Sequence, residues 1–401
     1  MLPRRAIVIT IAAAVAIGGL TVVPAVATLT APSPAQTSLR DLGRRHGLFI
    51  GSAISDTALA DTTDTTYRQI AATQFSTVTP ENVMKWDALE PTRGTYNWGP
   101  ADEFVKFAQA NHQLIRGHVL VWHSQLPKWL TDGVSAATIS KTELNDLLKK
   151  HITDVVTHFK GKIWQWDVVN EAVADSWATP DGVIGYKGFW YTNLGAGFIA
   201  DSFRWARATD PRALLFYNDY NIDAFGDHSA KDKAQFVYTM VKNLRAAGVP
   251  VDGVGSQAHL STRYGNYDAL QIADMLDAFA GLGVATALTE VDVRIKMTDG
   301  IKAGTSDDIN PAFQAQAANY SALLQGCLAS RHCISFTVWG FDDKHNWTTY
   351  TDLGSGKGGE ALAAIYDANY QPKRALNTLK ADLAYSGPPY VLERIPQHPQ
   401  P

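Results

Sequence analysis

Short apolar runs alternate with longer amphipathic stretches over most of this chain. The apolar runs are rich in aliphatic and β-branched residues, as is typical of buried parallel strands. They predict eight strands, at 48–54, 76–79, 114–122, 163–169, 214–218, 253–259, 285–291 and 334–339. Alternating strands and helices favour parallel pairing with right-handed crossovers. Eight such units close into a (β/α)8 or TIM barrel, so we expect an α/β protein with a single catalytic domain.

Helices are predicted where apolar residues recur with a 3.6-residue period. The clearest begins at a capping box formed by Ser140 and Glu143 and ends at Gly161. Its apolar stripe comprises Leu144, Leu147, Leu148, Ile152, Val155, Val156 and Phe159. Two further stripes end before Gly248 and Gly281, because glycine commonly terminates a helix.

Both ends of the chain lack this periodicity. Residues 1–27 combine Arg4 and Arg5 with an apolar run and a small-x-small sequence at 25–27, which predicts a secretory signal. The apolar run is longer than usual, so an uncleaved membrane anchor remains an alternative. We expect a disordered leader at 28–41, the barrel at 42–385, and a proline-rich tail outside the barrel at 386–401.

The charge composition limits the kinds of binding partner that we expect for this chain. Lys and Arg number 35 and Asp and Glu 39, so the net charge is −4, and removal of Arg4 and Arg5 with the signal gives −6. A mildly acidic chain without a Lys/Arg block argues against nucleic acid or an anionic membrane as the main partner. The 11 Trp include several near strand ends, where they can stack on sugar rings, although filling the core is the ordinary role of Trp.

Cys327 and Cys333 are the two cysteines of the chain. In an exported protein they are expected to form a disulfide, and two unpaired core thiols are the alternative. The closed loop is short, so the chain-entropy contribution is about 2 kcal/mol.

Two predicted strands lead into a glutamate. Glu171 follows the fourth strand in Trp-Asp-Val-Val-Asn-Glu, and Glu290 lies in the seventh within Leu-Thr-Glu-Val-Asp. Carboxylates at the C-terminal ends of barrel strands meet substrate rather than core. Cleavage of a glycosidic bond needs one carboxylic acid and one carboxylate on either side of the same atom. A surface salt bridge is the alternative for either glutamate taken alone.

Polar residues also follow most of the other strands, which a purely structural barrel would not require. They form a ring that predicts a binding cleft, and they include Glu81, Asn82, Lys85, His118, Trp122, Gln125, Tyr220, Gln257, His259 and Trp339.

Taken together, these motifs closely resemble the retaining endo-1,4-β-xylanases of glycoside hydrolase family 10, over roughly 42–385 and in the family's order. The resemblance implies a secreted enzyme that cleaves internal bonds of xylan by double displacement, with Glu171 as acid/base and Glu290 as nucleophile. The chain has Val291 where the family often has leucine. The segment 343–347 is less family-like, so Trp347 is matched less firmly than Trp339.

The resemblance and the side-chain chemistry also suggest supporting roles. Asn170 can bond the sugar 2-hydroxyl, His259 can bond the nucleophile with Asp292 fixing its tautomer, and Gln257 is expected near the acid/base. The non-reducing side of the cleft is assigned to Glu81, Asn82, Lys85, His118, Trp122 and Gln125. The walls of the cleavage point are assigned to Trp339 and Trp347, and Tyr220 is a supporting residue.

Three rival functions remain open at this point. A metal-dependent hydrolase could use His118, His123 and His259, but the usual close ligand spacing is absent, and a core position is the alternative for His118 and His123. The others are a carbohydrate-binding barrel without activity and a glycosidase acting on β-1,4-glucan. We expect no metal and no cofactor, since side chains supply both chemical steps. We also expect a monomer without stable membrane association after signal cleavage.

Overall fold

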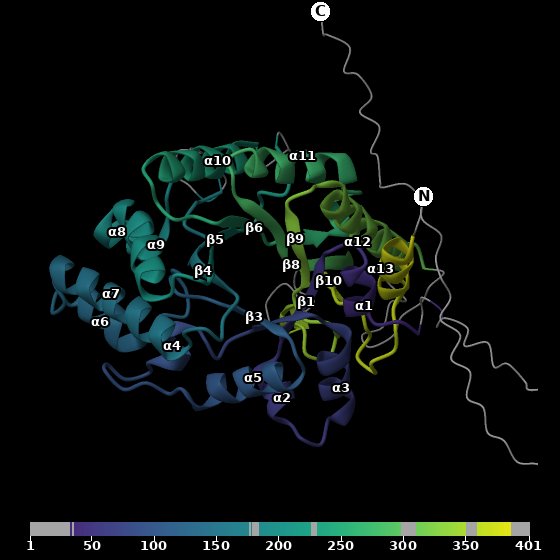
Figure 1. The fold of residues 1–401 in the computed structure, drawn as a ribbon, viewed down its shortest axis with the longest axis horizontal. Helices are drawn as coiled ribbons and strands as arrows, with labels where there is room; N and C mark the ends of the chain where they lie inside the picture. Colours follow the sequence, from purple (N-terminus) through teal and green to yellow (C-terminus); the bar gives the residue numbers. More distant parts are fainter. Residues whose placement is uncertain are drawn as a thin grey trace, which may run out of the picture.

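The computed structural model describes residues 33, 36–175, 178, 184–225, 231–297, 310–349 and 359–385. Helices surround an inner ring of strands in this part of the chain (Figure 1). The predicted signal at 1–27, the leader up to residue 32 and the tail at 386–401 lie outside the described residues.

Eight parallel strands form the inner barrel, which confirms the predicted fold class. They are β1 (Phe49–Ile54), β2 (Thr77–Pro80), β3 (Leu114–Gly117), β4 (Gln165–Asn170), β5 (Leu214–Asp219), β6 (Gly253–Ser256), β8 (Ala285–Lys296) and β9 (Cys333–Val338). Each strand pairs with its neighbour, and β9 pairs with both β8 and β1, which closes the ring. Two short strands also pair with β8, namely β7 (His259–Ser261) in parallel and β10 (Glu360–Ala361) in the antiparallel sense.

Three strand boundaries differ from the prediction. The third strand ends at Gly117, and beyond it the buried residues pair with β4 again only at an isolated bridge between Val121 and Val169. The sixth is interrupted before His259 by Ala258, whose φ of 58° breaks the extended backbone. The seventh continues to Lys296, where it pairs with β10. Apolar runs report burial, and a buried segment can leave and rejoin the strand pairing within one run.

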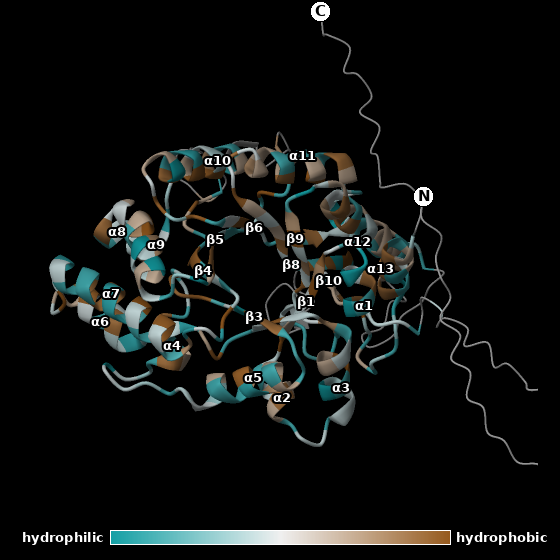
Figure 2. Ribbon diagram, viewed as in Figure 1, coloured by the Kyte–Doolittle hydropathy of each residue, from teal (hydrophilic) through white to brown (hydrophobic). Residues whose placement is uncertain are grey.

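The helices follow the strands around the outside of the ring. They are α1 (Leu39–Arg44), α2 (Asp56–Ala60), α3 (Thr65–Gln74), α4 (Trp86–Leu89), α5 (Gly99–Ala110), α6 (Lys128–Ser135), α7 (Lys141–His158), α8 (Gly188–Leu194), α9 (Gly197–Thr209), α10 (Lys231–Ala246), α11 (Ala269–Ala280), α12 (Pro311–Ala329) and α13 (Arg374–Ala384), with short 3₁₀ turns at η2 (Thr262–Tyr264) and η3 (Trp347–Thr349). Hydrophilic and hydrophobic residues alternate along α5 and α10 (Figure 2). Within the described residues, the helices are all too short or too polar to cross a bilayer.

Helix α7 has the predicted N-terminus. The Ser140 hydroxyl accepts a hydrogen bond from the backbone N–H of Glu143 at 3.2 Å. The residues Leu144, Leu148, Ile152, Val155 and Val156 of the predicted stripe are buried. This helix therefore follows from its own sequence.

The folded part begins earlier than the predicted Leu42. Helix α1 starts at Leu39, and both Leu39 and Leu42 are buried where the helix packs against β1 and α13. The predicted leader at 28–41 was therefore too long at its end. A helix of six residues is too short to show a recognisable period.

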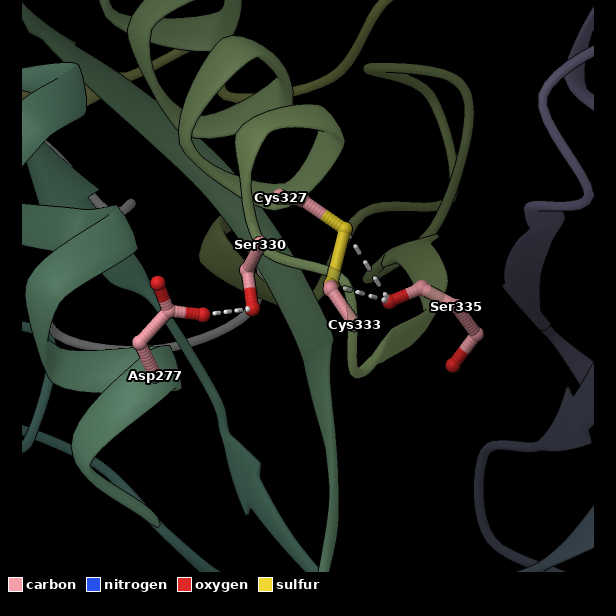
Figure 3. Close-up of a disulfide and its surroundings, with 5 residues drawn as sticks. All are labelled: Asp277, Cys327, Ser330, Cys333 and Ser335. Carbon is pink, nitrogen blue, oxygen red and sulfur yellow. Dashed lines mark hydrogen bonds between the residues drawn. A yellow bond between two sulfur atoms is a disulfide. The ribbon is translucent and has the colours of Figure 1, made fainter. Parts of the chain in front are cut away.

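The predicted disulfide is present and joins the end of α12 to the start of β9 (Figure 3). The sulfur atoms of Cys327 and Cys333 are 2.01 Å apart. Ser330, in the same turn, donates a hydrogen bond of 2.7 Å to Asp277 of α11. The turn between α12 and β9 is thus held both covalently and by a neighbouring helix.

Candidate active site

Glu290 is a buried carboxylate on β8 with three donors around it. Its Oε1 accepts hydrogen bonds from Asn218 Nδ2 at 2.7 Å and from Arg116 at 3.3 Å, and its Oε2 accepts one from His259 Nε2 at 3.1 Å. Burial alone would raise its pKa, but the hydrogen bond from His259 and the positive charges of His118, His259 and Arg116 lower the pKa to about 2. Glu290 is therefore ionised at neutral pH.

His259 lies between two carboxylates. Its Nδ1 is 2.7 Å from Asp292 Oδ2, and its Nε2 faces Glu290. Burial opposes protonation, yet the charge of Asp292 and the hydrogen bonds to both carboxylates raise the pKa of His259 to about 10. The ring is an imidazolium that donates in both directions. Asp292 consequently fixes the orientation of the ring and stabilises its charge.

Trp347 and Trp339 stand beside this histidine. Trp347 Nε1 donates to Asp292 Oδ2 at 2.7 Å, and its ring centre lies 5.2 Å from that of His259. The Trp339 ring is 6.2 Å from His259 and 5.2 Å from His118. Both tryptophans therefore lie at the Glu290 end of the strands, where their faces can border a sugar.

Glu171 follows β4 directly. Its Oε2 accepts a hydrogen bond from Trp122 Nε1 at 2.9 Å and its Oε1 one from Gln257 Nε2 at 3.1 Å, while His123 Nε2 is 4.0 Å from Oε2. Its backbone N–H donates to Asn218 O at 2.9 Å. Trp122, which we expected on the non-reducing side of the cleft, thus also contacts the expected acid/base.

Of the eight non-glycine residues with positive φ in the described part of the chain, four lie in the loops that follow barrel strands β3 to β6. They are Gln125 (45°), Glu171 (55°), Asn221 (55°) and Ala258 (58°). Such conformations are unfavourable for residues with a Cβ, and they persist where the surrounding structure enforces them, often at functional sites. One of these four is Glu171 itself, so its side chain is presented from a strained backbone.

A chain of amide side chains joins the two glutamates. Gln257 Nε2, which bonds Glu171, also donates to Asn170 Oδ1 at 3.1 Å. Asn218 Nδ2 donates to the same Asn170 oxygen at 2.8 Å and to Glu290 at 2.7 Å. Because both donors share Oδ1, the NH₂ group of Asn170 is the end that can meet a ligand.

A further cluster of polar side chains surrounds Lys85 on the loops that follow β2 and β3. Its Nζ donates to Asn82 Oδ1 at 3.0 Å and to Gln125 Oε1 at 2.6 Å, and lies 5.0 Å from the Trp122 ring centre. Burial lowers the pKa of Lys85, and burial raises that of nearby Glu81 to about 7, partly offset by the charge of Lys85. The predicted residues of this side are thus brought together.

Another cluster of polar side chains surrounds Tyr220, which directly follows β5. Lys187 Nζ donates to its hydroxyl at 2.8 Å, and Lys233 Nζ stands 3.4 Å from its ring centre. Lys233 also forms ion pairs with Asp219 at 2.9 Å and with Asp175 at 3.4 Å. Tyr220 was predicted from the sequence but both lysines were missed, because Lys187 lies before α8 and Lys233 lies in α10, both distant from Tyr220 in sequence.

Arg116, Asp167 and Asn218 were also missed as site residues. All three are buried within barrel strands, and Asp167 bonds both Arg116 and His118. A signal was available, since a charged residue inside an apolar strand needs a partner in the interior. The sequence alone did not identify that partner.

The histidines of the metal-hydrolase alternative face different carboxylates. His118 bonds Asp167, His123 lies near Glu171, and His259 bonds Glu290 and Asp292. Ligand atoms of His118, Asp167 and Glu290 do lie within 4.8 Å of one another. Arg116 already bonds both of these carboxylates, so a cation balances them, and the arrangement favours carboxylate chemistry over a metal site.

The fold and the site together define a class of protein. A closed (β/α)8 barrel places ionised Glu290 within β8 and Glu171 directly after β4, and three amide side chains link the two carboxylates. This is the arrangement of a barrel glycoside hydrolase.

Comparison with known proteins identifies the family. Residues 38–382 match Glycosyl hydrolase family 10, and the chain belongs to that family. It is 38% identical to endo-1,4-beta-xylanase B of Thermotoga neapolitana over 335 residues, which is 84% of this chain and 88% of the relative. It is 35% identical to endo-1,4-beta-xylanase C of Phanerodontia chrysosporium over 349 residues, covering 86% of this chain and 78% of the relative. Among solved structures it resembles xylanase 10B of Thermotoga petrophila RKU-1 in complex with xylobiose, with a TM-score of 0.75 and 36% identity over 86% of this chain and 97% of the other.

Proposed function

We propose that this protein is a retaining endo-1,4-β-xylanase in which Glu290 is the nucleophile and Glu171 the acid/base. The observation that carries the proposal is the amide chain from Glu171 through Gln257, Asn170 and Asn218 to Glu290, which ties both carboxylates to one small volume. The relatives named above are xylanases, and one was solved with xylobiose, which supports xylan as the substrate.

The reaction takes two steps. Glu290 attacks the anomeric carbon, the glycosidic C–O bond breaks, and Glu171 gives its proton to the departing oxygen. A covalent sugar ester on Glu290 results. Glu171, now ionised, takes a proton from water, whose oxygen displaces Glu290 from the anomeric carbon and restores both side chains.

The neighbours of Glu290 suit this cycle. While Glu290 is ionised, Glu290 and Asp292 together balance the positive charge of His259. Once Glu290 has formed the ester, Asp292 still balances the imidazolium, so no unpaired buried cation arises. The NH₂ group of Asn170 supplies a donor for the sugar 2-hydroxyl, a contact that strengthens in the transition state.

The two remaining polar groups provide binding on both sides of the cleavage point. Lys85, Asn82, Gln125 and Glu81 bind sugars on the non-reducing side, and Tyr220 borders the leaving group. Binding residues on both sides fit cleavage within a polymer better than removal of terminal sugars. Discrimination against β-1,4-glucan depends on how the cleft excludes the extra hydroxymethyl group.

The test follows the anomeric configuration of the products by NMR during xylan digestion, with chelator present. Wild type should release the β-anomer first. Glu290→Gln and Glu171→Gln should lose activity by at least about a hundredfold on xylan, whereas the exposed control Glu103→Gln should match wild type. Initial release of the α-anomer, loss of activity with chelator, or an active Glu290→Gln would refute the mechanism. Equal turnover of carboxymethyl-cellulose would refute only the substrate.

For location and assembly, we infer a secreted monomer with a cleaved signal at 1–27, one catalytic domain and a tail at 386–401. The N-terminal pattern and the disulfide support export. N-terminal sequencing of protein from the culture medium and light scattering of the purified chain test these points. An N-terminus at Met1 in a membrane fraction, or a dimer mass, would contradict them.

A further inference from the structure

Arg116 is a buried cation beneath the expected nucleophile. It lies on β3, and 3% of its side chain is exposed. Its Nε bonds Asp167 Oδ1 at 3.2 Å, and one terminal nitrogen bonds the other oxygen of Asp167. The same nitrogen bonds Glu290 Oε1 at 3.3 Å, and the second terminal nitrogen donates to Thr289 O at 2.8 Å. Every nitrogen of the guanidinium is therefore engaged.

These contacts fix Glu290 at two points. Thr289 precedes Glu290 on β8, so Arg116 holds the main chain next to the glutamate as well as the carboxylate itself. Asp167, on the intervening strand β4, anchors the other edge of the guanidinium. Because the guanidinium is planar and rigid, fixing one of its edges also fixes the direction in which the other edge donates hydrogen bonds.

We propose that Arg116 is a positioning residue that keeps Glu290 weakly basic and thereby speeds release of the covalent sugar. The proposal rests on the proposed function, because it takes Glu290 as the nucleophile. The guanidinium of arginine carries a positive charge in proteins. It therefore stabilises the carboxylate of Glu290 relative to any neutral form, whether acid or ester.

The two steps of the reaction respond in opposite ways. Formation of the sugar ester removes the charge of Glu290, so the contact with Arg116 opposes this step. Hydrolysis of the ester restores the charge, so the contact favours departure of Glu290 from the anomeric carbon. His259 and Asn218 act in the same direction, but Arg116 alone also bonds the backbone of Thr289.

A purely structural role for Arg116 predicts different effects on folding and on the two reaction steps. Balancing Asp167 inside the barrel would affect folding, and its loss would weaken both steps without changing the titration of Glu290. The distinguishing readouts are therefore the acid limb of the pH profile and the ratio of the two steps.

The experiment uses the mature chain with Arg116→Met, Arg116→Lys and the double variant Arg116→Met/Asp167→Asn, which removes both charges of the buried pair. The substrate is a 2,4-dinitrophenyl β-xylobioside, and folding is checked by circular dichroism. In Arg116→Met or the double variant, we expect the acid limb of kcat/KM to move up by about one pH unit. We also expect kcat and KM to fall together and the burst of dinitrophenol to grow, because the ester accumulates. Arg116→Lys, which keeps the charge, should keep the acid limb near that of wild type.

Arg40→Met is the matched control, since Arg40 also donates to backbone carbonyls but away from the site. It should leave the acid limb and the burst unchanged. The inference is overturned if the folded Arg116 variants show an unmoved acid limb, or a lower kcat at unchanged KM. A 2-deoxy-2-fluoro-xylobioside inactivator separates this failure from that of the proposed function. If the inactivator does not label Glu290 of the wild type, the proposed function is refuted. If it labels Glu290 but the Arg116 variants keep the wild-type acid limb or lower kcat at unchanged KM, only the role of Arg116 is refuted.

Discussion

Replacement of His259 by glutamine removes a buried imidazolium that faces two carboxylates. The pKa of His259 is raised to about 10, from an ordinary value near 6.5, chiefly by Asp292 and Glu290 acting against burial. By linkage, this shift corresponds to about 4 kcal/mol of folding free energy at pH 7. Because the folded-state pKa is the higher one, the contribution is complete below about pH 6.5 and is lost as the pH rises through 10.

The assay is urea denaturation of wild type and His259→Gln at several pH values between 6 and 10.5. We expect the difference in unfolding free energy to be about 4 kcal/mol at pH 7 and less than about 1 kcal/mol near pH 10. The control His46→Gln, at an exposed histidine whose Nε2 lies 2.8 Å from Leu383 O, should cost about 1 kcal/mol or less at pH 7. A difference between wild type and His259→Gln that stays constant up to pH 10.5 would mean that His259 is neutral in the folded protein.

Three further changes test the scaffold and the binding groups. Ser140→Ala removes the N-cap of α7 and should lower the unfolding free energy by about 1 kcal/mol; no loss in urea denaturation would mean that the cap is inactive. Cys327→Ala/Cys333→Ala should cost about 2 kcal/mol on the short-loop entropy model and leave kcat unchanged, so a fall in kcat on xylan would contradict a local role. Lys85→Met removes donors to Asn82 and Gln125 and should raise KM for xylo-oligosaccharides about tenfold with less effect on kcat; the reverse pattern would place Lys85 in the chemical step.

The local sequence determined the elements and the chemistry available. The stripe and cap of α7 were readable because both depend on residues within a few turns of one another. The apolar runs located the eight barrel strands, and the motifs at their ends supplied Glu171 and Glu290 together with their expected neighbours. The disulfide was also expected from the sequence, because Cys327 and Cys333 are the two cysteines of a chain whose N-terminus predicts export.

Tertiary structure decided which polar side chains meet. Arg116 reaches Glu290 across a sequence separation of 174 residues, and Asn218 reaches it across 72. Such pairs depend on closure of the barrel and on the register between strands, neither of which is encoded in the spacing within one strand. A sequence shows that a buried charge needs a partner, but only the closed barrel selects that partner and so sets the charge state of Glu290.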